Sequence, residues 1–175
     1  MELIQIVALV ASLVSLTFAA FLAYKVVGKD EGNDQIRFIG KAIQDGAMAF
    51  LSREYRLLAI FVAIMAVILA VFVDLDVTGR IDKQSTSSIP VGTAIAYLVG
   101  AFGSGLAGFI GMSIAVRANT RTTVQAMQGL NPALRVAFNS GAVMGMSVVG
   151  LALIGVTLML IVFSNDASIV AGFGF

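Results

Sequence analysis

The chain has 175 residues, of which 59% are hydrophobic and only 12% are charged, and its net charge is +1. A soluble domain carries about 45–50% apolar and about 25% charged residues, so this composition excludes a protein whose whole surface faces water. The lack of Cys excludes disulfides, and the lack of His removes the commonest general base and metal ligand.

The first two predicted spans follow from the length of the uncharged runs, because a bilayer core of about 30 Å needs about 20 apolar residues. The first span is expected over 3–27, where the uncharged run from Leu3 to Tyr24 is too long for a signal peptide and has no basic start. The second is expected over 36–73. Its amphipathic first half should lie outside the bilayer or at its surface, since charges occur throughout that half.

Two further spans follow a polar loop that runs from Asp74 to Ser88. The third is expected over 89–117, beginning beside Pro90 and continuing as a polar helical extension. Gly129 should stop this helix, with Asn131 as the N-cap and Pro132 as the first residue of the next.

The fourth span is expected over 133–163, and a fifth begins at about 168–175. The sequence therefore predicts an all-α membrane protein with four transmembrane helices, forming a single transmembrane region over 1–175.

Basic residues predict the orientation of these spans. Nine of the eleven lie in the links between spans one and two and between spans three and four, and only Arg80 and Lys83 lie elsewhere. The positive-inside rule places both links in the cytoplasm and both chain ends on the other side. The nine residues are Lys25, Lys29, Arg37, Lys41, Arg53, Arg56, Arg117, Arg121 and Arg135.

Small residues repeat at steps of four in the third and fourth spans. The repeats are Gly103, Ala107, Gly111 and Ala115 in one, and Ala133, Ala137, Gly141 and Gly145 in the other. Such stripes let membrane helices approach backbone to backbone, so Gly145→Leu is expected to destabilise the bundle. The alternative is that Gly is simply frequent in membrane helices.

No complete site is predicted from the residues themselves. Asp30 and Asp34 lie in a Gly-containing turn without a further acid at ligand spacing. Asp45, Arg53 and Glu54 are expected on a solvated or ion-paired helix face. Arg117, Arg121 and Arg135 are interpreted as flanking charge, and the terminal segment 172–175 is a weak candidate for a Gly-rich loop. Asn139 and Ser140 are expected to form hydrogen bonds across helices.

Two stretches resemble the membrane-bound, ion-translocating pyrophosphatases. Residues 39–55 are similar to the Ile-x-x-Gly-Ala-x-Ala-Phe-Leu-x-x-Glu-Tyr pattern that opens the second helix of that family. Residues 111–122 and 129–145 are similar to its third and fourth helices and the turn between them. The resemblance implies an N-terminal portion of a pump that couples hydrolysis of cytoplasmic pyrophosphate to the export of protons or sodium.

The resemblance also implies magnesium for the whole protein, with potassium possible, and a homodimer. Catalytic, cofactor-binding and metal-binding residues belong to later helices of that family, so none is assigned here, and this portion alone is expected to bind no cofactor and to be inactive. Its expected partners are the lipid bilayer and the remaining helices of the same protein, without nucleic acid. The alternative is a complete four-helix subunit or scaffold without catalysis.

Overall fold

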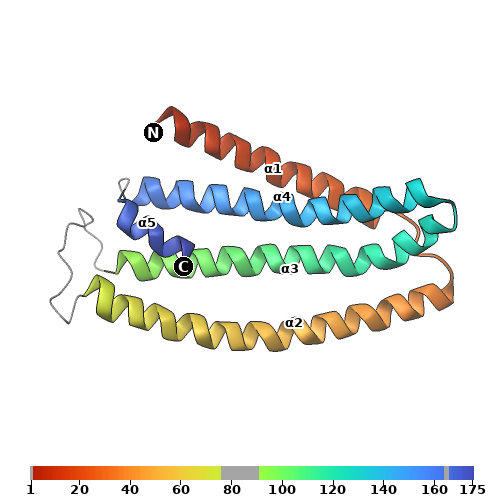
Figure 1. The fold of residues 1–175 in the computed structure, drawn as a ribbon, viewed down its shortest axis with the longest axis horizontal. Helices are drawn as coiled ribbons and strands as arrows, with labels where there is room; N and C mark the ends of the chain where they lie inside the picture. Colours follow the sequence, from red (N-terminus) through yellow and green to blue (C-terminus); the bar gives the residue numbers. More distant parts are fainter. Residues whose placement is uncertain (1, 76–90, 164–165) are drawn as a thin grey trace.

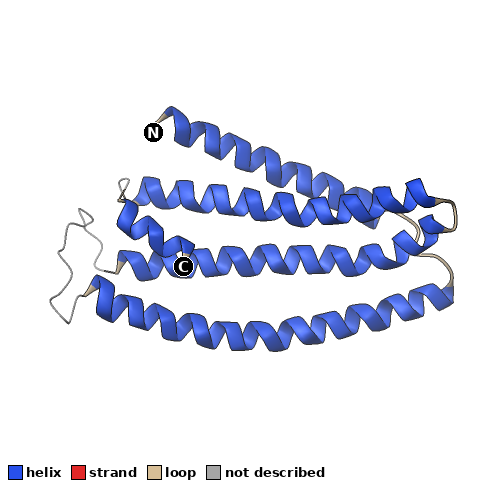
Figure 2. Ribbon diagram, viewed as in Figure 1, coloured by secondary structure: helices blue, strands red, loops and turns tan. Residues whose placement is uncertain are grey.

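The computed structural model describes residues 2–75, 91–163 and 166–175, and these form a row of long antiparallel helices (Figure 1). Within the described residues every regular element is helical (Figure 2). The elements are α1 (Leu3–Val27), α2 (Asp34–Ile68), the π-helical turn η1 (Leu69–Asp74), α3 (Gly92–Ala126), α4 (Leu130–Val162) and α5 (Ala167–Gly174). In the row, α1 packs on α4, α4 on α3 and α3 on α2.

The prediction of an all-α fold with four apolar helices of membrane length is confirmed. The helix expected over 36–73 is observed over Asp34–Asp74, and it begins after Asn33, whose side chain accepts a hydrogen bond from the Ile36 N–H at 3.0 Å. The predicted start of the third helix beside Pro90 lies outside the described residues.

The predicted beginning of the fourth helix is wrong by a few residues. Gly129 is the N-cap, with a φ of 140°, and α4 begins at Leu130. Asn131 and Pro132 are therefore already within the first turn, where a missing N–H is tolerated. Glycine adopts this positive φ without the penalty of a side chain, so the chain can turn here from the end of α3 at Ala126 into the first turn of α4.

The contact between α1 and α4 depends on small and hydroxyl-bearing residues. Buried positions of α1 recur every third or fourth residue, as expected for one helix face: Ser12, Ser15, Ala19, Leu22 and Val26. The Ser15 hydroxyl donates to the carbonyl of Met146 at 2.7 Å. A Cβ added at Gly150 would lie 2.7 Å from the Leu16 side chain and 3.3 Å from the Ser12 carbonyl oxygen. The two backbones therefore approach closely.

The predicted small-residue stripes are only partly packing faces. Ala107 and Gly111 are buried, and a Cβ at Gly111 would lie 2.6 Å from Met144. No described atom, by contrast, lies within 4 Å of a Cβ added at Gly141 or Gly145. Since a helix has 3.6 residues per turn, each step of four rotates the face by about 40°. One step after the buried Ala133, at Ala137, the stripe is already exposed and has left the contact.

The second helix is held by few contacts, all to α3 among the described residues. Only Gly40 and Leu51 are buried in α2. The Tyr55 hydroxyl donates to the Gly105 carbonyl at 2.7 Å. At the far end, the two carboxylate oxygens of Asp74 accept hydrogen bonds from the Thr93 and Ala94 N–H groups at 3.1 and 3.0 Å. Asp74 thereby caps α3 from another helix.

The short helix α5 turns back onto the bundle beside α3 and α4 (Figure 1). Its Ile169 and Phe173 pack with Ala96, Met159 and Phe163. A Cβ at Gly172 would lie 2.6 Å from the Thr93 carbonyl oxygen. Gly172 and Phe173 thus belong to a packed helix end, which corrects the interpretation of segment 172–175 as a candidate ligand loop.

Candidate functional site: the basic end of the bundle

One end of the bundle gathers most of the polar chemistry of the described chain. The end of α1, the start of α2, the end of α3 and the start of α4 lie together there (Figure 1). Val26, Ala118 and Val136 form a buried cluster that joins α1, α3 and α4 at this end. The charged residues nearby are therefore attached to a packed framework.

Arg121 holds the link between α1 and α2. Its side chain is only 6% exposed, so it has a structural role in addition to that of flanking charge. Its Nε donates to the carbonyls of Val27 and Lys29, both at 3.1 Å, and Nη1 donates to the carbonyl of Arg117 at 2.6 Å. Nη2 donates to the Val27 carbonyl at 2.9 Å and to Glu31 Oε1 at 2.8 Å. The last carbonyls of α1 have no partner within the helix, and the planar guanidinium supplies donors for them.

The acidic residues at this end are spread out. Asp30 Oδ1 lies 3.9 Å from Arg37 Nη2, and both side chains are more than half exposed. Asp34 begins α2, whereas Asp45 and Glu54 lie three and five turns further along it. Within the described residues no three Asp, Glu, His or Cys side chains are grouped as metal ligands.

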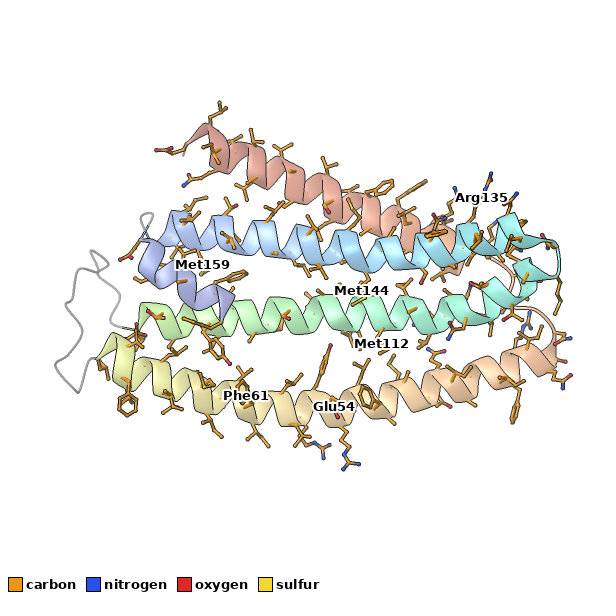
Figure 3. The ribbon with its side chains drawn as sticks, in the orientation of Figure 1. Glu54, Phe61, Met112, Arg135, Met144 and Met159 are labelled. Atoms are coloured by element: carbon orange, nitrogen blue, oxygen red, sulfur yellow. The ribbon has the colours of Figure 1, made fainter. Side chains whose placement is uncertain are left out.

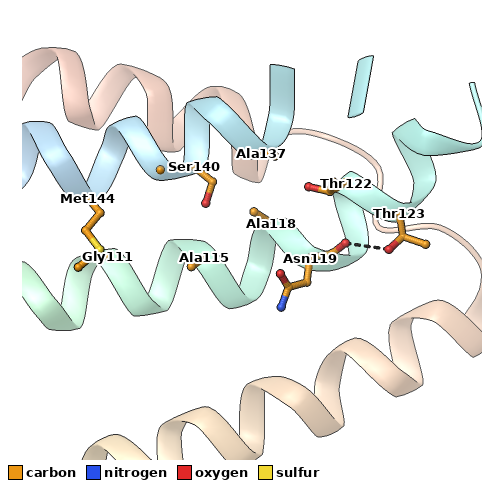
Figure 4. Close-up of a pocket in the computed structure, with 10 residues that line it drawn as sticks. Gly111, Ala115, Ala118, Asn119, Thr122, Thr123, Ala137, Ser140 and Met144 are labelled. Carbon is orange, nitrogen blue, oxygen red and sulfur yellow. Dashed lines mark hydrogen bonds between the residues drawn. The ribbon is translucent and has the colours of Figure 1, made fainter. Parts of the chain in front are cut away.

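A cavity of about 600 Å³ opens between α3 and α4. In Figure 4 the Met144 side chain reaches from α4 onto Gly111 of α3, and Asn119 and Ser140 lie further towards the basic end. Small residues such as Ala115 and Gly141 complete the lining. This hollow therefore presents small residues and polar side chains that another helix could contact.

A second cavity, of about 630 Å³, lies where α1 ends beside the start of α4. Its lining includes Lys25 and Lys29, together with Arg135, whose position on α4 is labelled in Figure 3. The amide side chains of Gln125, Asn131 and Asn139 also line it, and no acidic residue does so among the described residues. The arrangement can hold an anion.

Two polar contacts were missed from the sequence and one was misassigned. Asn139 and Ser140 form no side-chain hydrogen bond across helices within the described part of the chain; Ser15 of α1 makes such a bond instead. The partners of Arg121 and Asp74 are about 90 and about 20 residues away, and no local pattern marks either residue. The only signal available was that each residue lies within a few positions of an apolar run, as other charged residues of the chain also do.

Over its whole length the chain is similar in sequence to a group of membrane pumps. The model of the family described as "Inorganic H+ pyrophosphatase" matches residues 13–175. A K(+)-insensitive pyrophosphate-energized proton pump from Methanosarcina mazei is 39% identical over 100% of this chain and 24% of its own length. A pump of the same name from Chloroflexus aurantiacus is 37% identical, over 95% of this chain and 23% of its own length.

A relative with a different name is equally similar. The "Putative K(+)-stimulated pyrophosphate-energized sodium pump" of Clostridium tetani is 38% identical over 99% of this chain and 24% of its own length. The chain therefore spans about a quarter of the length of the curated relatives that it matches, and the match is to an N-terminal portion of them.

Proposed function

This chain belongs to the family of inorganic H+ pyrophosphatases, and we propose that it forms the first helices of a pump that couples hydrolysis of cytoplasmic pyrophosphate to export of an ion. The family match over residues 13–175 is the observation that carries the proposal. Relatives of almost equal identity are named as proton pumps and as a sodium pump, so the proposal covers both ions, with and without a requirement for potassium.

The role proposed for these helices is structural. The uncharged runs Leu3–Tyr24, Leu57–Val73 and Val136–Phe163 hold no Asp, Glu, Lys or Arg. Ion paths across membranes are lined by such groups, which are retained in spans only for function. Within this part of the pump the helices support an ion path made by other helices.

Magnesium, which the family implies for the whole protein, does not fit the residues described here. Phosphoryl transfer to water needs carboxylates that hold the metal around the phosphates. Asp30, Asp34, Asp45 and Glu54 are distributed along a turn and one helix. The magnesium site of the pump is therefore assigned to other parts of it.

We propose that further helices of the same protein pack against the face of α4 around Gly141 and Gly145. Both glycines are exposed, with open space at their Cβ positions among the described residues. Beside them lies the cavity with the polar side chains of Asn119 and Ser140. Membrane helices associate through small residues and interhelical hydrogen bonds, so an added helix can pack on the glycines and form hydrogen bonds with these side chains. The complete pump is proposed to be a homodimer.

The basic end is proposed to face the cytoplasm, with both ends of the chain on the opposite side. Nine of the eleven basic residues in the two links support this orientation. A cysteine at Ser52 should be labelled by an impermeant maleimide only from the cytoplasmic side. A cysteine at Ser85, outside the described residues, should be labelled only from the other side. Labelling of both from one side would contradict the four-span topology.

Complementation tests the proposed function. The Methanosarcina mazei relative is expressed without the quarter that this chain matches, either alone or together with this chain. Phosphate release from magnesium pyrophosphate is then measured in membranes. The chain alone and the shortened relative alone should remain at background, and the pair should hydrolyse pyrophosphate. Gly145→Leu should abolish this rescue without changing the stability of the chain itself.

The relative's own first quarter, supplied separately, is the positive control. Rescue by that control but not by this chain would contradict the proposed function. Hydrolysis by the chain alone would show that the active site has been misplaced, and Asp30, Asp34 and Asp45 would be the first residues to change.

A further inference from the structure

The basic cavity at the end of α1 has an unbalanced charge. Lys25, Lys29 and Arg135 contribute three positive charges to its lining, and none of the described residues that line it is acidic. None of the three forms a salt bridge within the described residues, where the ion pairs are Arg37–Asp30 and Arg121–Glu31. The start of α4 adds the positive end of its helix dipole. The cavity is therefore suited to an anion.

The loop that carries Lys29 is fixed in place. Arg121 binds the Lys29 carbonyl at 3.1 Å and the Val27 carbonyl at 2.9 Å from within the bundle. Val26 and Val136, which also line the cavity, are buried at 1% and 4% exposure. The cations are thus attached to rigid backbone, which lowers the entropy lost when a ligand binds.

The depth of the cavity matches the headgroup layer of a bilayer. Thr93, which Asp74 caps, marks the opposite end of α3, and Ala118 lies 25 positions further along, packed on Val26. At a rise of about 1.5 Å per residue this separation is about 38 Å. A bilayer has a hydrocarbon core of about 30 Å and measures about 40–45 Å with its headgroups. With Thr93 at one boundary of the hydrocarbon core, Ala118 lies about 8 Å beyond the other boundary. The basic cavity beside Ala118 is therefore at the level of the lipid phosphates.

An apolar track descends from the cavity along α1. Phe21, Phe18 and Val14 lie four, seven and eleven residues before Lys25, and so on the same helix face. They are 57%, 46% and 62% exposed, and the two Phe rings stack with centroids 6.5 Å apart. Tyr24 is 82% exposed, as is typical of an aromatic side chain at the membrane interface. These apolar side chains would not contribute to the binding of a soluble anion, whereas the acyl chain of a lipid can pack against them.

We propose that this cavity binds the phosphate headgroup of an anionic phospholipid, with an acyl chain along the Phe21–Phe18–Val14 face of α1. Lys25, Lys29 and Arg135 bind the phosphate oxygens, and the three amide side chains bind the polar groups beyond them. This lipid site does not depend on pyrophosphate hydrolysis.

Lipid binding by the purified 175-residue chain tests the proposal. Dioleoyl phosphatidylglycerol is titrated in detergent and the bound lipid is counted by native mass spectrometry, with phosphatidylcholine as the neutral comparison. The triple variant K25Q/K29Q/R135Q should bind phosphatidylglycerol roughly 100-fold more weakly, since each basic side chain near a membrane surface contributes roughly fivefold. The control K41Q/R53Q/R56Q removes the same charge from exposed positions of α2 and should stay within about twofold of the wild type.

Equal weakening in the two triple variants would overturn the site in favour of diffuse attraction, and so would equal binding of the two lipids. Protection of the chain from thermal unfolding by inorganic phosphate at the lipid's concentration would reassign the cavity to a soluble anion. If the triple variant loses its helical circular dichroism, the single variants decide. R135Q should bind about fivefold more weakly and R135K should bind as the wild type does, and no difference between them would overturn the proposal.

Discussion

Two pairs of helices, α1 with α4 and α2 with α3, are held together by different kinds of contact. In the most apolar 18-residue window of α4, 28% of positions are buried, whereas in that of α2 only 6% are. Yet α2 and the η1 turn that continues it carry the bulkier side chains, including Phe61 and Phe72, which are 57% and 49% exposed. Apolar bulk therefore does not predict burial in this protein.

The reason is the solvent. In water, a Phe side chain stabilises the fold by leaving the solvent, but lipid tails are as apolar as the protein interior. What drives contact in a membrane is close backbone approach and hydrogen bonding. The α1–α4 contact supplies both in one stretch, where Gly150 lies against Leu16 and the Ser15 hydroxyl donates to the Met146 carbonyl. The α2–α3 contact has separate points of attachment, at Gly40, Tyr55 and Asp74.

The largest effect should come from filling the α1–α4 contact. Gly150→Leu would press on Leu16 and on the Ser12 carbonyl, and it should lower the free energy of unfolding by about 3 kcal/mol, the upper range for overpacking. Gly145→Leu, on the open face of the same helix, should change it by less than about 0.5 kcal/mol. Unfolding of the purified chain in detergent with increasing SDS measures both. Equal losses would show that both faces of α4 are packed.

The second largest loss of stability should come from removing the Arg121 hydrogen bonds that join α3 to the end of α1. Arg121→Ala leaves the Val27 and Lys29 carbonyls without their donor, and should destabilise the chain by about 2 kcal/mol. Arg117→Ala, one turn earlier on an exposed face, is the matched control and should have almost no effect. Protease cleavage in the 28–33 link should also become faster in the Arg121 variant alone. Unchanged cleavage would mean that the link holds its shape without the guanidinium.

Removing the hydrogen bonds from the start of α3 to Asp74 should cause a smaller loss of stability. Asp74→Ala removes the acceptors of the Thr93 and Ala94 N–H groups and should destabilise the chain by about 1 kcal/mol, as for other helix N-caps. Asp45→Ala, on the exposed face of the same helix, controls for loss of negative charge. Amide hydrogen exchange of the first turn of α3 should accelerate only in the Asp74 variant. If exchange there is unaffected, the cap is not holding that turn.

The smallest effects distinguish single hydrogen bonds. Ser15→Ala and Tyr55→Phe each remove one interhelical bond, to Met146 and to Gly105, and each should destabilise by about 0.6 kcal/mol. Tyr24→Phe, at an exposed tyrosine, should be neutral. The two losses are best compared in separate denaturant titrations, where a much larger value for Tyr55 would reveal that α2 depends on this bond more than its few contacts indicate.

The fold was predictable because it follows from a local property. A run of about 20 uncharged residues must cross the bilayer as a helix, whatever it packs against. The positions of the four long helices could be derived in this way, and so could the long helical extensions beyond the uncharged runs. The start of α4 was misplaced because Gly129, which was interpreted as a helix stop, is the N-cap of the next helix.

The sequence by itself determined the number and lengths of the helices and the clustering of basic residues at the links, because both depend only on composition along the chain. The tertiary structure decided which glycines lie against a neighbour, since a four-residue stripe rotates away from a contact in a helix of 3.6 residues per turn. It also decided that Arg121 would be buried and that Lys25 and Arg135 would share a cavity. Residues about a hundred positions apart meet only when the helices pack, and no local pattern records which face each helix turns to the next.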